Sequence, residues 1–320
     1  MFYVDQAEGV ETPVCGLQPG RSQSVSELQC PLCQARNSVK RFRENGLSLR
    51  MCRDCELFFI APYPTIAQQR QRVSLDERAD INLLDCARRY EGERLYYDRH
   101  FQMIAEECAG AESILDIGCG TGHLLERLGR ERNLHRVGIE LNPEAAELAR
   151  RVSGCPIFEM PLEEFRSERR FDVVTMINVF SHVPAIKAMF ASIRAALAAD
   201  GKLILRTSEM SANVSRWNQL HWGVPDDLHF LGLRTLDFIC KKYGFAVARH
   251  VRTPFENELF LPSRWRQMGR NTAVNLLKRI SAPLPGFLSV LQMAYAAALG
   301  RRLFVSFIVL KPISIRRNAS

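Results

Sequence analysis

From residue 114 to residue 310, short apolar runs alternate with amphipathic segments. The apolar runs predict buried strands at 114–117, 137–141, 171–177, 202–206, 245–251 and 303–310. The segments between them predict helices at 123–132, 143–152, 184–199 and 233–243. Pro143 suits a helix start, whereas Asp200-Gly201 and Gly244 are expected to end the helices that precede them. This alternation is typical of a parallel sheet covered by helices on both faces, so we predict a doubly wound α/β fold.

A glycine-rich turn follows the first predicted strand, with Gly118, Gly120 and Gly122 at alternate positions. Glycine lets the backbone approach a ligand with no side chain in the way. Glu140 ends the next apolar run, where an acid can bind the two hydroxyls of a ribose. Asp116 distinguishes a dinucleotide from a cationic cofactor as the ligand. A carboxylate at this position would repel the pyrophosphate of a dinucleotide, but it suits an ammonium and a sulfonium. The spacing also differs from the Gly-x-Gly-x-x-Gly of NAD sites, so the pattern predicts S-adenosylmethionine.

This combination of a glycine turn and a later acid resembles the cofactor motif of class I S-adenosylmethionine-dependent methyltransferases. The similarity extends from about Tyr90 to Lys311. The resemblance implies a Rossmann-like, seven-stranded, doubly wound sheet that ends in an antiparallel hairpin, which the last two predicted strands would form. A glycine turn without a ligand and an NAD-binding turn are the other interpretations of the motif.

The resemblance also implies which residues contact the cofactor. In the family, the glycine turn holds the methionine end, the acid after the second strand binds ribose, and later loops cover adenine. Asp116 is then expected near the ammonium, Glu140 at the ribose and the stretch 158–160 against adenine, with Met160 as the matching position. Carried over by position, the full cofactor-binding set is Asp116, Gly118, Gly120, Gly122, Glu140, Leu141, Met160 and Asn178.

Two loops at the predicted carboxyl edge of the sheet carry histidines that could act as general bases. A base is needed only when the acceptor must lose a proton, because the sulfonium already provides a good leaving group. His182 lies in a segment that resembles the family's motif after the fourth strand, with Ser181 in place of an acid. His229 lies in a loop that borders the acceptor pocket in similar zinc-ribbon methyltransferases. We rank His229 first, His182 second and His221 third, and each can instead be a hydrogen-bonded structural residue.

Four cysteines near the N-terminus form two Cys-x2-Cys pairs separated by eighteen residues. This interval is in the range of a zinc ribbon, and four thiolates complete a tetrahedral shell, which predicts a structural zinc rather than a catalytic one. Gln34 and Glu56 occupy positions where ribbon knuckles often have glycine. Reduced cysteines without a metal are the alternative. The predicted ligands are Cys30, Cys33, Cys52 and Cys55.

The segments outside the sheet suggest how the chain is divided. Ala61-Pro62-Tyr63-Pro64 is predicted to break the chain after the ribbon, and the following stretch to Glu112, rich in Arg, Glu, Gln and Leu, is predicted to be helical. Its Tyr90, Tyr96 and Tyr97 either line the cofactor entrance or pack in the core. The segment at about 255–302 is a helical insertion before the last strand. Its first half is basic and amphipathic, which suits a membrane surface, an anionic substrate or a lid packed on the core. The predicted divisions are a loose leader at 1–28, a zinc ribbon at 29–62, a methyltransferase domain at 63–312 and a tail at 313–320.

The net charge of +8 is concentrated at the C-terminal end. From residue 246 onward there are twelve Lys or Arg against two acids, so the remainder has 31 basic and 33 acidic residues. This distribution indicates one local surface that meets something anionic. The first residues lack a basic segment followed by an apolar run, and ten cysteines without a signal argue for reduced thiols. We therefore expect a cytoplasmic protein.

Together these patterns predict a methyltransferase that uses S-adenosylmethionine and carries a structural zinc. The resemblance, together with the local basic charge, implies a small acceptor that is anionic or carrier-linked. The combination resembles bacterial methyltransferases of sugar, polysaccharide and secondary-metabolite pathways. An RNA methyltransferase is one alternative, although residues 30–60 carry no dense basic and aromatic cluster. A regulator that keeps the fold without catalysis is the other, and the intact Asp116, Glu140 and glycines speak against it.

Overall fold

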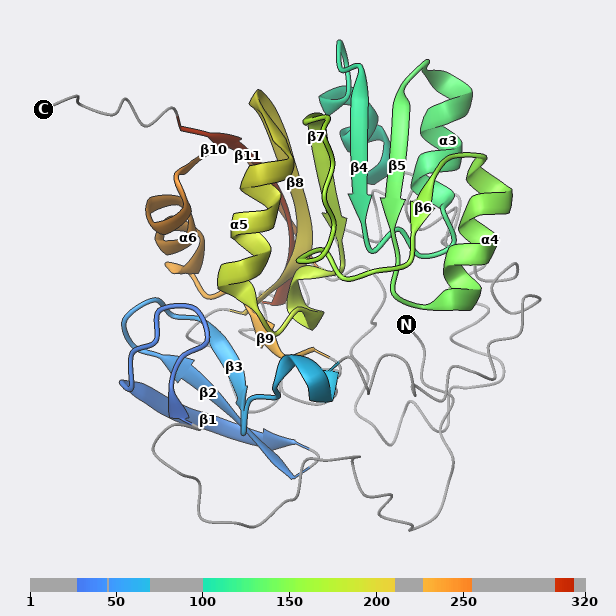
Figure 1. The fold of residues 1–320 in the computed structure, drawn as a ribbon. Coiled ribbons are helices and arrows are strands. Elements are labelled where there is room, and N and C mark those ends of the chain that lie inside the picture. Colours follow the sequence, from blue (N-terminus) through green and yellow to red (C-terminus); the bar gives the residue numbers. More distant parts are fainter. Residues whose placement is uncertain (1–27, 45, 70–99, 211–226, 255–302, 314–320) are drawn as a thin grey trace, which may run out of the picture.

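The computed structural model describes residues 28–44, 46–69, 100–210, 227–254 and 303–313. These residues form a seven-stranded sheet with helices on both faces, together with a smaller four-stranded sheet (Figure 1). Within the described ranges, no helix is both long enough and apolar enough to cross a membrane.

The large sheet has the strand order β10-β11-β8-β7-β4-β5-β6. The central strands run parallel: β4 pairs with β5 and β7, and β7 pairs with β8. β11 runs antiparallel to both β8 and β10, so the predicted doubly wound sheet with a final antiparallel hairpin is confirmed. The strands are β4 (Ser113–Ile117), β5 (His135–Ile139), β6 (Ile157–Phe158), β7 (Phe171–Ile177), β8 (Leu197–Met210), β10 (Phe245–Pro254) and β11 (Leu303–Pro312).

Helices cover the two faces of this sheet through two hydrophobic clusters. One cluster joins the sheet to α5 (Ile186–Ala196) and α6 (Thr235–Tyr243). The other joins it to α3 (His123–Glu131), α4 (Pro143–Ser153) and the helical residues 100–107. The molecule is therefore a three-layer α/β structure, as expected for strand and helix segments that alternate along the chain.

The helix predicted at 184–199 differs from the observed one at its C-terminal end. α5 ends at Ala196, and the next residue already belongs to β8, where Leu197 pairs with Phe171. The register then shifts, so that Val173 pairs with Lys202 and the residues between Leu197 and Lys202 form a bulge. Pairing with β7 thus overrides the helix propensity of the alanine-rich segment, and Asp200-Gly201 lies within a strand rather than at a helix end.

The smaller sheet lies at the edge of the large sheet toward which β4 and β5 point, below α5 and α6 in Figure 1. It contains β1 (Ser38–Glu44), β2 (Leu47–Cys52) and β3 (Phe58–Ala61) from the N-terminal region. Its fourth strand, β9 (His229–Phe230), comes from much later in the chain and pairs with β3. Cys30, Leu57 and Phe59 share a hydrophobic cluster with residues of α5, α6 and the large sheet. The N-terminal unit therefore packs directly on the larger fold.

Several sequence predictions concern residues outside the described ranges. These are the leader up to residue 27, the tyrosines Tyr90, Tyr96 and Tyr97, His221, the insertion at 255–302 and the tail from residue 314. They stay predictions.

Candidate active site and four-cysteine cluster

The glycine turn after β4 has the backbone conformation that its sequence predicts. Gly118, Gly120 and Gly122 have φ angles of 68°, 55° and 77°, in the region that favours glycine. A Cβ on Gly118 would clash with Val179, and one on Gly122 would lie 2.9 Å from the Cα of Ala149 in α4. At Gly120 a Cβ would meet no atom within 4 Å. Two glycines therefore allow close packing, and the middle one leaves an open backbone surface that suits a bound ligand.

Glu140 joins the glycine turn to the end of β5. Its Oε2 accepts a hydrogen bond of 2.8 Å from the Gly120 N–H. Its Oε1 accepts from the N–H groups of Leu141 and Asn142, at 2.8 and 2.9 Å. A carboxylate has about four acceptor sites, so capacity remains for a ribose hydroxyl while the three N–H groups fix its orientation. The geometry fits the role predicted for Glu140.

Asp116 is buried below the same turn, with 3% of its surface exposed. Burial raises the pKa of its carboxyl group to about 7, and the nearby charge of Glu140 adds to this effect. A 2.6 Å hydrogen bond from the Thr175 hydroxyl acts in the opposite direction. A cation bound beside Asp116 would favour its ionised form, which fits the ammonium predicted there. Thr175 was not predicted, because it lies inside a buried strand and belongs to no motif.

Apolar side chains lie exposed beside Glu140. Leu141 and Phe158 are each 39% exposed, and the Glu140 N–H donates to the Phe158 carbonyl at 3.1 Å. Met160 is partly buried against the neighbouring core. Exposed apolar surface next to the acid predicted to bind ribose suits the flat face of an adenine. Phe158 belongs to the stretch 158–160 that is expected from the sequence to lie against adenine, and the structure leaves it more exposed than Met160.

Asn178 lies just beyond the end of β7, at the same edge of the sheet. Its φ of 59° is left-handed, which is uncommon for a residue other than glycine but is tolerated by asparagine. Its N–H donates to the Arg206 carbonyl at 2.9 Å, and its Oδ1 accepts from the Arg206 guanidinium. Arg206 is itself buried. This pairing with β8 fixes the loop that carries Val179 against Gly118. We refer to the glycine turn with Asp116, Glu140 and Asn178 as the cofactor side.

His182 follows on the same loop, in the short 3-10 helix Phe180–His182. Its Nε2 lies 3.7 Å from Oδ1 of Asp227, and the two side chains are 34% and 24% exposed. A partly exposed imidazole beside a carboxylate can accept a proton, since the carboxylate stabilises the resulting imidazolium. The sequence placed Asp227 in the segment around His229 but gave it no role.

His229 occupies a different environment from its predicted one. Its side chain is fully buried, with the ring edge-on to Phe180 at a centroid distance of 4.6 Å. Its Nδ1 shares a hydrogen bond of 2.8 Å with the Tyr63 hydroxyl. Burial lowers the pKa of His229 to about 3, with a further lowering from His182. His229 is therefore neutral at neutral pH. We refer to His182, Asp227 and His229 as the acceptor side.

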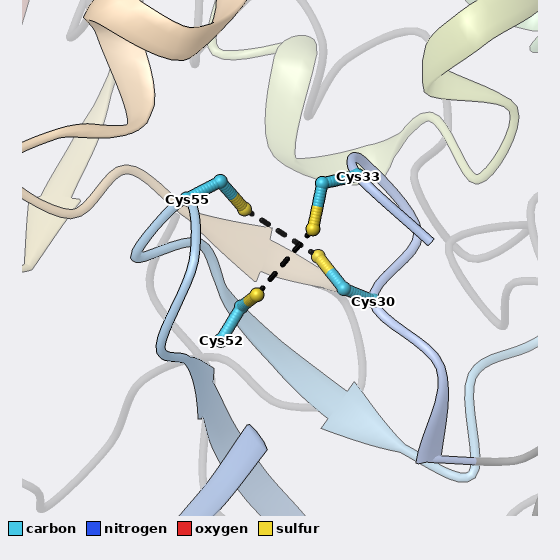
Figure 2. A group of neighbouring side chains, drawn as sticks. All are labelled: Cys30, Cys33, Cys52 and Cys55. Atoms are coloured by element: carbon cyan, nitrogen blue, oxygen red, sulfur yellow. Dashed lines mark hydrogen bonds between the residues drawn. The ribbon is translucent and has the colours of Figure 1, made fainter. Parts of the chain in front are cut away.

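The four predicted metal ligands converge in the N-terminal unit (Figure 2). All four Sγ atoms lie within 4.8 Å of one another, with 3.6 Å between Cys30 and Cys55 and 3.4 Å between Cys33 and Cys52. Tetrahedral zinc with Zn–S bonds of about 2.3 Å requires sulfur separations of about 3.8 Å. The donor set and its geometry therefore fit a zinc ion with no open position.

The two knuckles adopt the ribbon conformation although neither has glycine at the turn. Gln34 and Glu56 have φ angles of 66° and 59°. The Glu56 carboxylate accepts hydrogen bonds from the N–H and Nε of Arg234, at 3.0 and 2.8 Å. At Glu56, this contact with the larger fold therefore helps to hold a conformation that costs about 1 kcal/mol or more for a residue other than glycine.

A protein-family model described as "Methyltransferase domain" matches residues 88–250. The chain is 32% identical over 113 residues to a ubiquinone biosynthesis O-methyltransferase of Idiomarina loihiensis, a match that covers 33% of this chain and 45% of the relative. It is 36% identical over 77 residues to a dTDP-4-amino-2,3,4,6-tetradeoxy-D-glucose N,N-dimethyltransferase of Saccharopolyspora spinosa, covering 24% and 30% of the two chains. The matched part of the chain therefore spans less than half of the length of these curated relatives.

Solved structures show the same fold at low sequence identity. A candidate sarcosine dimethylglycine methyltransferase of Galdieria sulphuraria superposes with a TM-score of 0.50 and 14% identity, over 67% of this chain and 86% of that chain. This likeness concerns the arrangement of the sheet and helices.

Proposed function

We propose that this chain, which belongs to the class I S-adenosylmethionine-dependent methyltransferases, transfers the methyl group of that cofactor to a small anionic acceptor such as a nucleotide-linked sugar. One observation carries the proposal. The open backbone at Gly120 and the partly exposed pair of His182 and Asp227 lie at the same carboxyl edge of the sheet, linked by the contact of Gly118 with Val179. A cofactor in the turn would thus lie beside a group that can accept a proton.

When bound, the cofactor supplies an electrophilic methyl group on a sulfonium, so the protein mainly provides alignment and a dry site. Glu140 would hold the ribose, and Asp116 would hold the ammonium. Leu141 and Phe158 would cover the adenine with apolar surface. These contacts position the cofactor and do not take part in bond breaking.

For an acceptor hydroxyl, the residue that removes the proton is His182, with Asp227 stabilising the charge formed on its ring. This assignment reverses the order expected from the sequence. His229 has no exposed surface and a pKa of about 3, so it is a poor proton acceptor at neutral pH, whereas His182 is 34% exposed. An acceptor amine that is already neutral would need no base, and His182 would then serve only to orient it.

Two observations support an anionic acceptor. The chain after residue 245 has twelve basic residues and two acids. One relative is named for a dTDP-linked sugar, which carries a diphosphate. In the described part of this region, Arg249 and Arg252 are paired with Glu106, Glu107 and Glu209. Any unpaired positive charge that this region offers to an acceptor would then have to come from the basic residues beyond 254.

The four-cysteine cluster holds a structural zinc in this proposal. Four thiolates saturate the metal, so no position remains for a water or an acceptor. The metal stabilises the two knuckles rather than taking part in methyl transfer.

The experiment that tests the function is transfer of label from methyl-tritiated S-adenosylmethionine into a host lysate, fractionated into small molecules, lipids and RNA. Label in an anionic small-molecule fraction, lost with His182→Ala, is the expected result. Label in RNA would instead favour the nucleic-acid alternative. If calorimetry detects no binding of S-adenosylmethionine, the methyltransferase function is wrong.

A further inference from the structure

The four-cysteine ribbon and the acceptor side are parts of one hydrogen-bonded structure. β3 begins at Phe58, shortly after Cys55, and pairs with β9, with Phe58 opposite Phe230 and Phe59 opposite His229. The residue after β9, Leu231, forms a bridge to Glu209 at the end of β8. Backbone pairing therefore runs without a break from the ribbon, through the strand that carries His229, to the large sheet.

Two further sets of hydrogen bonds reach the pair of His182 and Asp227. The Ile60 N–H donates to the Leu228 carbonyl at 2.9 Å, and the Leu228 N–H donates to the Ser181 carbonyl at 2.8 Å. Gln69, which is 4% exposed, donates from Nε2 to the His182 carbonyl at 3.1 Å. The backbone next to Asp227 is therefore held by Ile60 of β3, and the backbone of His182 is held by Gln69, which follows β3 in the chain.

α6 fixes the other side of the ribbon at both knuckles. At its N-terminal end, the Thr235 hydroxyl donates to the Cys55 carbonyl at 2.9 Å, and Arg234 donates to the Arg53 carbonyl at 2.8 Å. At its C-terminal end, Lys242 donates to the Leu32 carbonyl. Zinc with four thiolates carries a net charge of −2, so the cations of Arg234 and Lys242 also suit the metal-bound state.

We propose that the metal-bound ribbon is a positioning element for the acceptor side: it holds His182 through Gln69 and Asp227 through the Ile60–Leu228–Ser181 hydrogen bonds, and it leaves the cofactor side unaffected. An effect of zinc on methyl transfer depends on the proposed function, because it requires His182 to act on the acceptor. An effect of zinc on the local structure does not depend on the proposed function. Loss of zinc should loosen residues 59–61, 181–182 and 227–230, whereas the glycine turn should keep its structure.

Amide hydrogen exchange of the full-length protein, with and without zinc, tests the effect of zinc on the local structure. The reporter amides are Ile60 and Leu228, and the reference amides are Gly118, bonded to the Ile139 carbonyl, and Glu140. Removal of zinc with a chelator should speed exchange at the reporters about tenfold or more, and adding zinc back should reverse it. Unchanged reporters would overturn the proposal. Equal acceleration at the reference amides would also overturn it, because zinc would then stabilise the whole chain.

A substitution in the zinc-loaded protein tests the link to His182. Gln69→Met keeps the side-chain length but cannot donate to the His182 carbonyl, and Gln102→Met is the control, since Gln102 is exposed on the helical segment 100–107. Gln69→Met should move the ring resonances of His182 and lower label transfer to the lysate acceptor about 10- to 100-fold, with an unchanged Kd for S-adenosylmethionine. Identical His182 resonances in both variants would overturn the link. If these resonances and the reporter amides respond as expected but no fraction accepts label, the positioning role stands and the proposed function fails.

Discussion

The cofactor side and the acceptor side of this protein are built in different ways. The residues around the glycine turn, from Asp116 to Asn142, lie within one strand-helix-strand unit and are joined mainly by backbone groups, such as the Gly120 N–H on Glu140. On the acceptor side, the Tyr63 hydroxyl meets His229 across 166 positions of sequence, and Gln69 meets His182 across 113. The first arrangement depends on one short stretch of the chain, whereas the second requires the N-terminal unit to be packed on the larger fold.

The largest expected effect is on kcat, and it distinguishes the acceptor side from the cofactor side. His182→Ala should lower kcat for a hydroxyl acceptor by roughly 10²- to 10⁴-fold, the range typical of a general base, with an unchanged Kd for S-adenosylmethionine. His135→Ala is the matched control, because His135 is exposed at the opposite edge of the sheet. Turnover assays measure kcat, and calorimetry measures the Kd for S-adenosylmethionine. Full turnover by His182→Ala on a hydroxyl acceptor would remove His182 from the mechanism.

Glu140→Ala should show the converse pattern. Loss of hydrogen bonds from ribose to a charged carboxylate, worth about 1.5–3 kcal/mol, should weaken cofactor binding about 10- to 100-fold while the ring resonances of His182 stay in place. Glu131→Ala removes an equivalent charge at the end of α3, where its side chain is 47% exposed, and should leave the Kd unchanged. Equal Kd values for the two variants would contradict a ribose role for Glu140.

The contact between α6 and the ribbon can be tested by stability. The buried Thr235 hydroxyl donates to the Cys55 carbonyl and accepts from the Gly232 N–H, both at 2.9 Å. Thr235→Val leaves these two groups unpaired and should lower the free energy of unfolding in urea by about 1–3 kcal/mol, with faster release of zinc to a chromophoric chelator. Thr207→Val is the control: within the described residues, the buried Thr207 hydroxyl has no hydrogen-bond partner. A loss of stability as large in Thr207→Val would contradict the role of the Thr235 hydroxyl.

The smallest effect concerns the pH dependence of the cofactor side. The raised pKa of Asp116, about 7, means that its carboxyl group is mostly protonated at pH 6 in the free protein. If the cofactor ammonium binds the ionised form, binding releases a proton below pH 7, and affinity should rise up to tenfold per pH unit between about pH 5.5 and 7 before levelling off. Calorimetry in buffers of different ionisation enthalpy measures this release. In Asp116→Asn the pH dependence over this range should vanish, and its persistence would exclude Asp116 as the source.

Much of the structure could be predicted because it depends on local pattern. The strands β4, β5, β7, β8, β10 and β11 and the helices between them follow from apolar periodicity, and the positive φ angles of the turn follow from its glycines. The two-residue strands β6 and β9 were not predicted, because they are too short to show a periodicity. The end of α5 was not predictable, because pairing of Leu197 with Phe171 competes with local helix propensity. The knuckle conformations of Gln34 and Glu56 are unfavourable locally and, at Glu56, are supported by a partner 178 positions away.

The sequence by itself determined the glycine turn with Glu140 and the pairing of the four cysteines, since both depend on a few residues at fixed short spacing within a turn or a knuckle. The tertiary structure alone decided which histidine is accessible. His229 and His182 lie on similar loops in sequence terms, but pairing of β9 with β3 buries His229 beneath the ribbon, while His182 stays partly exposed beside Asp227. Segments far away in the chain determine how deeply an imidazole is buried, and burial determines its pKa and its chemistry. Local sequence spacing cannot predict this burial.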